Sequence, residues 1–105
     1  MNSYNKYTDL QINELVATRL KKKCLLTEES VLAYMDSGYR TFDPCNNPTD
    51  AMPIIIENKI GLSPMYHSNK WTADCLDYDF ISVNKNPLRA AMEVFLMIKD
   101  AENEG

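Results

Sequence analysis

The sequence lacks any long apolar segment. No run approaches the roughly 18 consecutive apolar residues that a membrane span needs. The residues after Met1 are polar, whereas a secretory signal would begin with a basic stretch and continue with an apolar one. We therefore expect a protein that is neither secreted nor embedded in a membrane. Glycine occurs only three times and proline five times in 105 residues, which excludes collagen-like and low-complexity compositions. We expect one globular domain over residues 1–105.

Cysteines are also few. Cys24, Cys45 and Cys75 are odd in number and far apart, which favours reduced thiols in a cytosol over a disulfide framework. The net charge of -4 is uneven, because residues 1–40 carry six basic and five acidic groups whereas residues 41–105 carry five basic and ten acidic groups. A nucleic-acid-binding protein usually has a basic stripe that matches the phosphate array. This balance disfavours nonspecific DNA binding but allows a small basic patch.

The first predicted helix opens at Thr8, whose hydroxyl can cap it while Gln11 reaches back, as in a capping box. Apolar residues then recur at helical spacing and form one buried stripe: Ile12, Leu15, Val16 and Leu20. Basic residues lie in the last turn or just beyond it: Arg19, Lys21, Lys22 and Lys23. Positive charge there complements the exposed carbonyl groups of a helix end. A solvated helix end is the simpler interpretation, and a phosphate-binding patch is the alternative.

Residues 30–43 predict a β-hairpin. Val31–Met35 and residues 39–42 are rich in aromatic and β-branched side chains. The three residues between them end in Gly38, which suits a bulged turn with glycine in a left-handed conformation. A short helix over residues 31–35 that ends at Gly38 is the competing interpretation.

A cluster of turn formers and helix caps at residues 43–50 starts a second helix, which the pattern extends to about residue 59. Pro48 and Pro53 fit this helix only in or near its first turn, where a missing amide hydrogen costs little. Beyond this helix, three short segments are typical of strands: residues 62–66, 71–76 and 80–83.

The last predicted helix begins at Asn86 and Pro87, a cap followed by proline at the first helical position. One face of this helix is apolar: Leu88, Ala91, Met92, Phe95 and Leu96. The polar residues 100–105 should fray. The element order is therefore α-ββ-α-ββ(β)-α, which predicts an α+β fold with one antiparallel sheet of four to five short strands covered by three helices.

Three stretches of the sequence resemble a family of small phage proteins. They are residues 8–13, residues 42–51 with 53–55, and residues 86–92 with 95–96. On these stretches the chain is similar to NinX-type proteins, which are encoded in the nin region of lambdoid phages and prophages. The resemblance spans nearly the whole chain. It implies a phage protein of the bacterial host cytoplasm that is dispensable for the core life cycle and has no assigned biochemical role.

Few residues suggest catalysis or metal binding. A thiol just before a helix N-terminus can become a nucleophile, but Cys45 would need a base, and His67 is the only histidine. A small buried side chain is the simpler role for Cys45. The three cysteines and His67 are spaced too widely for a zinc site. The aspartate pairs at positions 43 and 50 and at 77 and 79 favour turn capping over cation binding or acid–base chemistry. We expect no catalytic set, no metal and no cofactor.

The two Asn-Pro helix starts suggest a small ligand-binding surface. Helix N-termini present unpaired amide hydrogens that suit anions, and an arginine one turn later can clamp a carboxylate or phosphate. A lone tryptophan among strands is a natural stacking platform for a base or a peptide. The predicted ligand-binding residues are Asn46, Asn47, Asp50, Trp71, Asn86 and Arg89. This hypothesis requires the two helix starts to converge in space; capping and core packing are the alternative explanation.

The sequence favours a non-enzymatic binding or regulatory module that acts on a host or phage protein. A small enzyme for a phosphorylated or nucleotide substrate is the alternative, with Asp43, Cys45 or Asp50 as the reactive group and Arg89 as the anion clamp. Nucleic-acid binding through residues 21–23 is a third and disfavoured hypothesis. The methionines of the second and last helices also leave a homodimer open.

Overall fold

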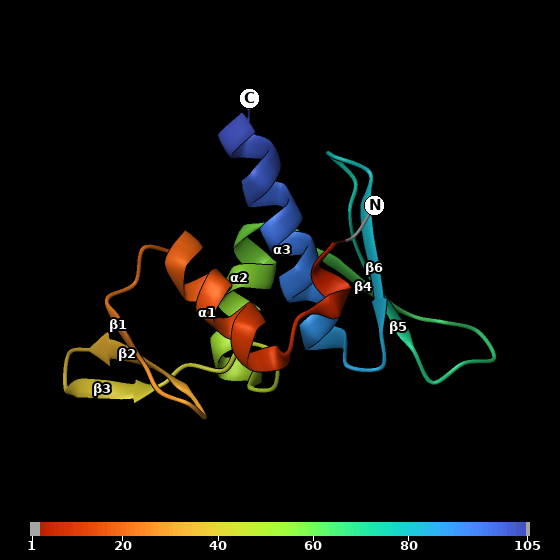
Figure 1. Cartoon of the computed structure of the whole chain (residues 1–105). Coiled ribbons are helices and arrows are strands. Elements are labelled where there is room, and N and C mark those ends of the chain that lie inside the picture. The colour runs from red at the N-terminus through yellow and green to blue at the C-terminus, as the bar shows by residue number, and fades with distance from the viewer. Residues whose placement is uncertain (1–2, 105) are drawn as a thin grey trace.

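The computed structural model describes residues 3–104 and contains three α-helices and two small antiparallel sheets (Figure 1). A short 3-10 helix, η1 (Tyr4–Lys6), precedes α1 (Asp9–Arg19), α2 (Pro48–Glu57) and α3 (Pro87–Glu104). The α+β class is confirmed. Within the described residues, no helix is both long and apolar enough to cross a membrane.

α1 is defined by its cap and by one buried stripe. The predicted capping box is confirmed, because Thr8 Oγ1 accepts the amide of Gln11 at 3.1 Å and the amide of Thr8 donates to the Gln11 side chain at 2.9 Å. Ile12 and Val16 of the predicted stripe are fully buried, and Leu15 and Leu20 are partly buried.

The first sheet, sheet A, has the strand order β1-β2-β3, with β1 at Cys24–Leu26, β2 at Val31–Met35 and β3 at Gly38–Thr41. The hairpin of β2 and β3 confirms the strand interpretation over the helical one. Gly38 has the positive φ, 118°, for which glycine suits this turn. It pairs with Met35, however, so the turn holds two residues and not the expected three. β1 is absent from the prediction because a three-residue strand is too short to show a period of two.

The second sheet, sheet B, is a meander of β4 (Gly61–Pro64), β5 (Trp71–Cys75) and β6 (Phe80–Asn84). All three predicted strands are present, with small shifts at their ends. Ala73 and Cys75 are buried on one face of β5, and α3 packs against β5 and β6.

The prediction of one sheet with four to five strands is wrong. The described residues form two separate three-stranded sheets, because each strand pairs with its neighbour in sequence and α2 interrupts the series between β3 and β4. Figure 1 shows the two sheets on opposite sides of the helices. Each sheet therefore has one face toward the helices and one face turned away from them.

α2 begins at Pro48, as predicted, but it ends at Glu57 and not at about residue 59. The Asn58 side chain donates to a carbonyl oxygen one turn back at 2.8 Å. Lys59 then takes a left-handed conformation with a φ of 53°, which stops the helix. Pro53 lies inside the helix, beyond the first turn where it was expected, so one backbone hydrogen bond of α2 is missing.

α3 supplies much of the core. Four residues of its predicted apolar face are fully buried: Ala91, Met92, Phe95 and Leu96. The helix continues through Glu104, and the fraying expected of residues 100–105 stays a prediction. Near the end of the helix, the carboxylate of Asp100 accepts the hydroxyl of Tyr4 and the guanidinium of Arg19, the latter at 2.5 Å. Gly105 of the predicted tail lies outside the described residues.

Candidate functional site

The two Asn-Pro helix starts carry the caps that the sequence predicts. Asn47 precedes α2, and its side chain accepts the amide of Thr49 at 3.0 Å. Asn86 precedes α3, and its side chain accepts the amide of Leu88 at 2.9 Å. The proline that follows each asparagine is the first residue of its helix, where no amide hydrogen is needed. The side-chain oxygens of Asn47 and Asn86 are thus used to cap their own helices.

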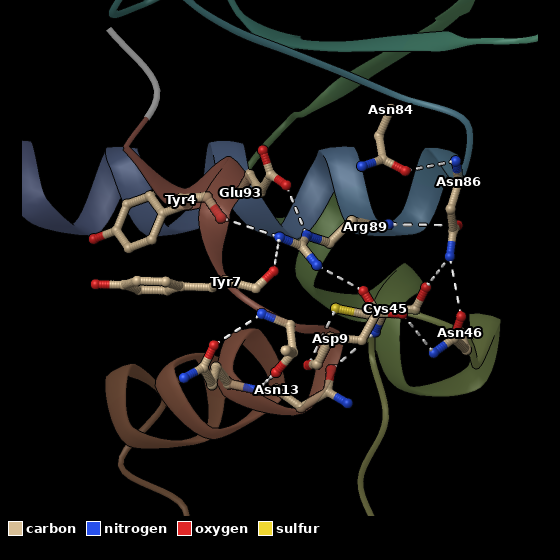
Figure 2. A network of polar contacts seen from close by, with 12 residues as sticks. Tyr4, Tyr7, Asp9, Asn13, Cys45, Asn46, Asn84, Asn86, Arg89 and Glu93 are labelled. Atoms are coloured by element: carbon tan, nitrogen blue, oxygen red, sulfur yellow. Dashed lines mark hydrogen bonds and ion pairs between the residues drawn. The ribbon is translucent and has the colours of Figure 1, made fainter.

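The two helix starts converge in space (Figure 2). Asn86 Nδ2 donates to the carbonyl oxygen of Cys45 at 2.6 Å and to Oδ1 of Asn46 at 3.1 Å. Asn46 Nδ2 in turn donates to the carboxylates of Asp9 and Asp43, each at 3.2 Å. The turn before α2 is therefore joined both to the start of α3 and to α1.

Asn13 of α1 fixes the backbone of the same turn. It is buried, its Nδ2 donates to Asp43 Oδ1 at 2.7 Å, and its Oδ1 accepts the amide of Cys45 at 3.1 Å. The amide of Asp43 donates to the carboxylate of Asp50 at 2.9 Å. Asp50, predicted to bind a ligand, therefore stabilises this turn.

Arg89 lies at the centre of the network and is only 6% exposed. Its Nε donates to Glu93 and its Nη1 to Asp9, each at 2.7 Å. Its Nη2 donates to the backbone oxygens of Tyr4 at 3.0 Å and Tyr7 at 2.6 Å. All three guanidinium nitrogens are thus used within the chain, and α3 is tied to α1 and to the N-terminal segment (Figure 2).

The charge of Arg89 is stabilised by its two carboxylate partners. Burial acts to lower the pKa of Arg89, but the hydrogen bonds to Asp9 and Glu93 outweigh burial and raise the pKa above its ordinary value. Glu93 is fully buried and also accepts the hydroxyl of Ser82 at 2.6 Å. A buried guanidinium that is already paired is a poor receptor for an anion from solution. The geometry therefore argues against Arg89 as the clamp of a carboxylate or phosphate.

Cys45 is fully buried beside Arg89. Its thiol donates to the backbone oxygen of Asp9 at 3.8 Å. Burial raises the pKa of the Cys45 thiol far above its ordinary value, and the Asp9 carboxylate adds to this effect. The thiol stays protonated at neutral pH, so the geometry favours a small buried side chain over a nucleophile.

A small cavity of about 160 Å³ opens beside the network. Its lining includes three carboxylates, those of Asp9, Glu29 and Asp43, and no basic side chain among the residues described. Such a lining repels phosphate and other anions, which does not fit a phosphorylated or nucleotide substrate. Within residues 3–104, no group of three or more His, Cys, Asp or Glu side chains is arranged to hold a metal ion.

Trp71 lies on β5, and the neighbouring strand β6 leads to Asn86 of the network. Trp71 is half-buried and pairs with Asn84 of β6, whose Oδ1 accepts the amide of Asn86 at 2.9 Å. The six predicted ligand-binding residues therefore do not form one site. Asn46, Asn86 and Arg89 share the network, Asn47 and Asp50 stabilise the start of α2, and Trp71 belongs to sheet B.

Several members of the network were not predicted from the sequence. Glu93 lies four residues after Arg89, a helical spacing that indicates an ion pair and offered a usable signal. Asp9 lies 80 residues from Arg89 in the chain, and no local pattern connects them. Asn13 sits in the middle of α1, where a polar residue normally faces solvent.

A larger cavity separates α2 from sheet A, and we call it the α2 groove. Its volume is about 310 Å³. Its floor is apolar: Leu20, Met35, Phe42, Pro53 and Ile54. Lys22 and Arg40 line it from the sheet side, and Asp50 and Glu57 line it from α2. Lys22 Nζ lies 5.4 Å from the centre of the Phe42 ring.

These contacts define an α+β protein in which a buried arginine and two helix-start asparagines tie three helices together. The family model described as bacteriophage P22 NinX matches residues 3–99. The chain therefore belongs to the NinX family of phage proteins, which confirms the resemblance seen in its three sequence stretches. No match is found among the curated proteins.

Proposed function

We propose that this member of the NinX family is a non-enzymatic accessory protein that binds a host or phage protein in the bacterial cytoplasm. The observation that carries the proposal is the α2 groove together with the uncovered apolar side of α2. The side chains at the two helix starts are used to hold the fold together. We therefore assign the binding function to the groove and not to Asn46, Asn86 and Arg89.

α2 leaves apolar side chains in solvent next to the groove. Met52 is 39% exposed, and Ile56, one turn later, is 68% exposed. Pro53 and Glu57, which follow them directly in sequence, line the groove. Exposed apolar residues that gather beside a cavity and are rimmed by polar ones mark sites where a partner binds.

The charges of the groove indicate the chemistry of the partner. Lys22 and Arg40 are exposed, and neither forms an ion pair with another described residue. A carboxylate of the partner would pair with these cations while an adjacent apolar side chain enters the floor. The proposed partner therefore presents a segment in which a large apolar residue stands next to an acidic one that faces Lys22 and Arg40, away from Asp50 and Glu57 on the α2 side.

The enzyme alternative has less support. Cys45 is buried and protonated, Arg89 is already paired, and the cavity at the helix starts is lined by carboxylates. These groups do not form a nucleophile activated by a base. Cys24, Cys45 and Cys75 are all free thiols, which fits a protein of a reducing cytoplasm.

Site-specific photo-crosslinking in phage-infected bacteria tests this proposal. A photoreactive amino acid at Ile56 should give one defined crosslinked species, identified by mass spectrometry. The same amino acid at Leu76, which is 86% exposed in the turn between β5 and β6, is the matched control and should not give it. The charge reversals Lys22→Glu and Arg40→Glu should abolish the species. Identical patterns from positions 56 and 76 would count against the proposal, and so would a species at position 56 that contains only two copies of this chain.

A further inference from the structure

The outer face of sheet A, which is turned away from the helices, carries two tyrosines side by side. Tyr34 of β2 pairs with Tyr39 of β3, so both side chains leave the same face of the sheet. Their ring centres lie 5.3 Å apart at an interplanar angle of 73°. Tyr34 is 53% exposed and Tyr39 is 39% exposed. Val31 and Ala33, which alternate with Tyr34 along β2, are buried on the opposite face.

A lysine adjoins this aromatic pair. The carbonyl oxygen of Lys23 accepts the amide of Tyr34 at 2.8 Å, and Lys23 Nζ lies 5.4 Å from the centre of the Tyr34 ring. Lys22 lies instead over Phe42, which lines the α2 groove. Successive side chains of an extended chain point to opposite faces, so Lys22 and Lys23 lie on opposite faces of sheet A.

The rest of the outer face holds no acidic residue at a described strand position. Leu25, Leu32 and Thr41 lie opposite one another across the three strands and complete the face. The acidic residues of this region lie in the two connections between strands: Glu28, Glu29 and Asp36. The face therefore combines exposed aromatic rings with positive charge, although the whole chain has a net charge of -4.

We infer that the outer face of sheet A binds single-stranded nucleic acid, with bases stacked on Tyr34 and Tyr39 and a phosphate paired with Lys23. Aromatic rings on a sheet accept bases of any sequence, and neighbouring cations hold the backbone. A duplex keeps its bases stacked on each other, so the single strand is the favoured form. This function is separate from protein binding in the α2 groove, which lies on the other side of the sheet.

Fluorescence anisotropy with a labelled single-stranded DNA of about 12 nucleotides tests the inference. The variant Tyr34→Leu with Tyr39→Leu keeps apolar bulk but removes both rings, and it should bind about tenfold more weakly or worse. Tyr66→Leu, which removes a tyrosine that is 87% exposed beside sheet B, should bind like the wild type. Lys23→Gln should make the slope of log affinity against log salt shallower by about 0.7, as expected for one lost phosphate contact.

Several results would overturn the inference. They are no salt-sensitive binding of the single strand by the wild type, equal weakening by Tyr66→Leu and by the double variant, or equal affinity for a duplex of the same sequence. An outer face that contacts a protein would instead give a photo-crosslink from position 25 and no strand binding, which also overturns it. Circular dichroism verifies that each variant is folded at the assay temperature. Ile56→Asp in α2 should leave strand binding unchanged, so the two proposals fail independently.

Discussion

At the scale of single residues, Arg89 shows what can and cannot be predicted for a polar side chain. Its position one turn into a helix that starts with Asn-Pro suggested an anion clamp. The structure instead pairs it with Glu93, four residues away, and with Asp9, 80 residues away. A buried charge requires a partner, but a sequence does not show which distant residue supplies it.

Replacing Arg89 with methionine should lower the free energy of unfolding by about 3–5 kcal/mol, because Glu93 would stay buried without its cation. The double variant Arg89→Met with Glu93→Leu should recover much of this loss, since it leaves no unpaired charge inside. Urea unfolding followed by Trp71 fluorescence measures both effects. Arg40→Met, at an exposed position, is the control and should change stability by less than about 0.5 kcal/mol. An Arg89→Met variant as stable as the control would contradict the structural role of Arg89.

Cys45 should be protected from thiol reagents in the folded protein, because it is fully buried and burial raises its pKa. Cys24 is only partly buried and should react first. Timed alkylation at about pH 8, followed by peptide mapping, measures the two rates. Equal labelling of Cys45 and Cys24 in the native protein would show that Cys45 is accessible and would revive the nucleophile hypothesis.

Tyr4 should make the stability depend on alkaline pH. Burial, followed by the hydrogen bond to Asp100, raises the pKa of Tyr4 from 10.0 to about 12. The folded state therefore holds this proton more tightly than the unfolded state. The resulting stabilisation is complete below about pH 10 and is lost as the pH rises toward about 12. The difference in unfolding free energy between wild type and Tyr4→Phe should shrink over this range in urea titrations; a difference independent of pH would refute this linkage.

At the scale of elements, signals that act within a few residues were readable from the sequence. Thr8, Asn47 and Asn86 marked the starts of all three long helices, because a cap bonds to amides within the first turn. The division into two sheets was not readable, because the grouping of distant strands depends on tertiary packing and not on local pattern. For the same reason the sequence raised the convergence of Asn46 and Asn86 as a question, and the structure was needed to answer it.

Pro53 is the local feature of α2 that fits its helix least well. Pro53→Ala should raise the free energy of unfolding by about 1 kcal/mol, because it restores a backbone amide and helix propensity. This value is the net effect after subtracting the entropy cost of a more flexible unfolded chain. It should also weaken partner binding, because Pro53 lines the α2 groove. Thermal unfolding and the crosslink yield from position 56 measure the two effects. Pro48→Ala at the first helical position is the matched control and should not stabilise; a Pro53→Ala variant that is no more stable than this control would be contrary evidence.

At the scale of the whole molecule, the helices separate two sheets that both keep an exposed face (Figure 1). Sheet A has surfaces of different chemistry on its two sides, with the α2 groove toward the helices and the tyrosine pair on the outside. Lys22 extends toward the α2 groove, and Lys23 extends toward the tyrosine pair. A protein with both proposed activities would bring a protein partner and a single strand together on one small sheet, while the network around Arg89 keeps the helices in place.

The central claim is that the helix starts hold the fold while the α2 groove binds the partner. It is tested most directly by recovering the partner, once crosslinking from position 56 has identified it, with tagged Ile56→Asp and tagged Asn46→Ala from infected cells. Asn46→Ala should lose about 1 kcal/mol of stability and still recover the partner. Ile56→Asp should stay folded, because Ile56 is 68% exposed, and should recover at least about tenfold less partner, the loss expected of an interface hot spot. The reverse result, with binding lost in Asn46→Ala and kept in Ile56→Asp, would place the site at the two helix starts and contradict the claim.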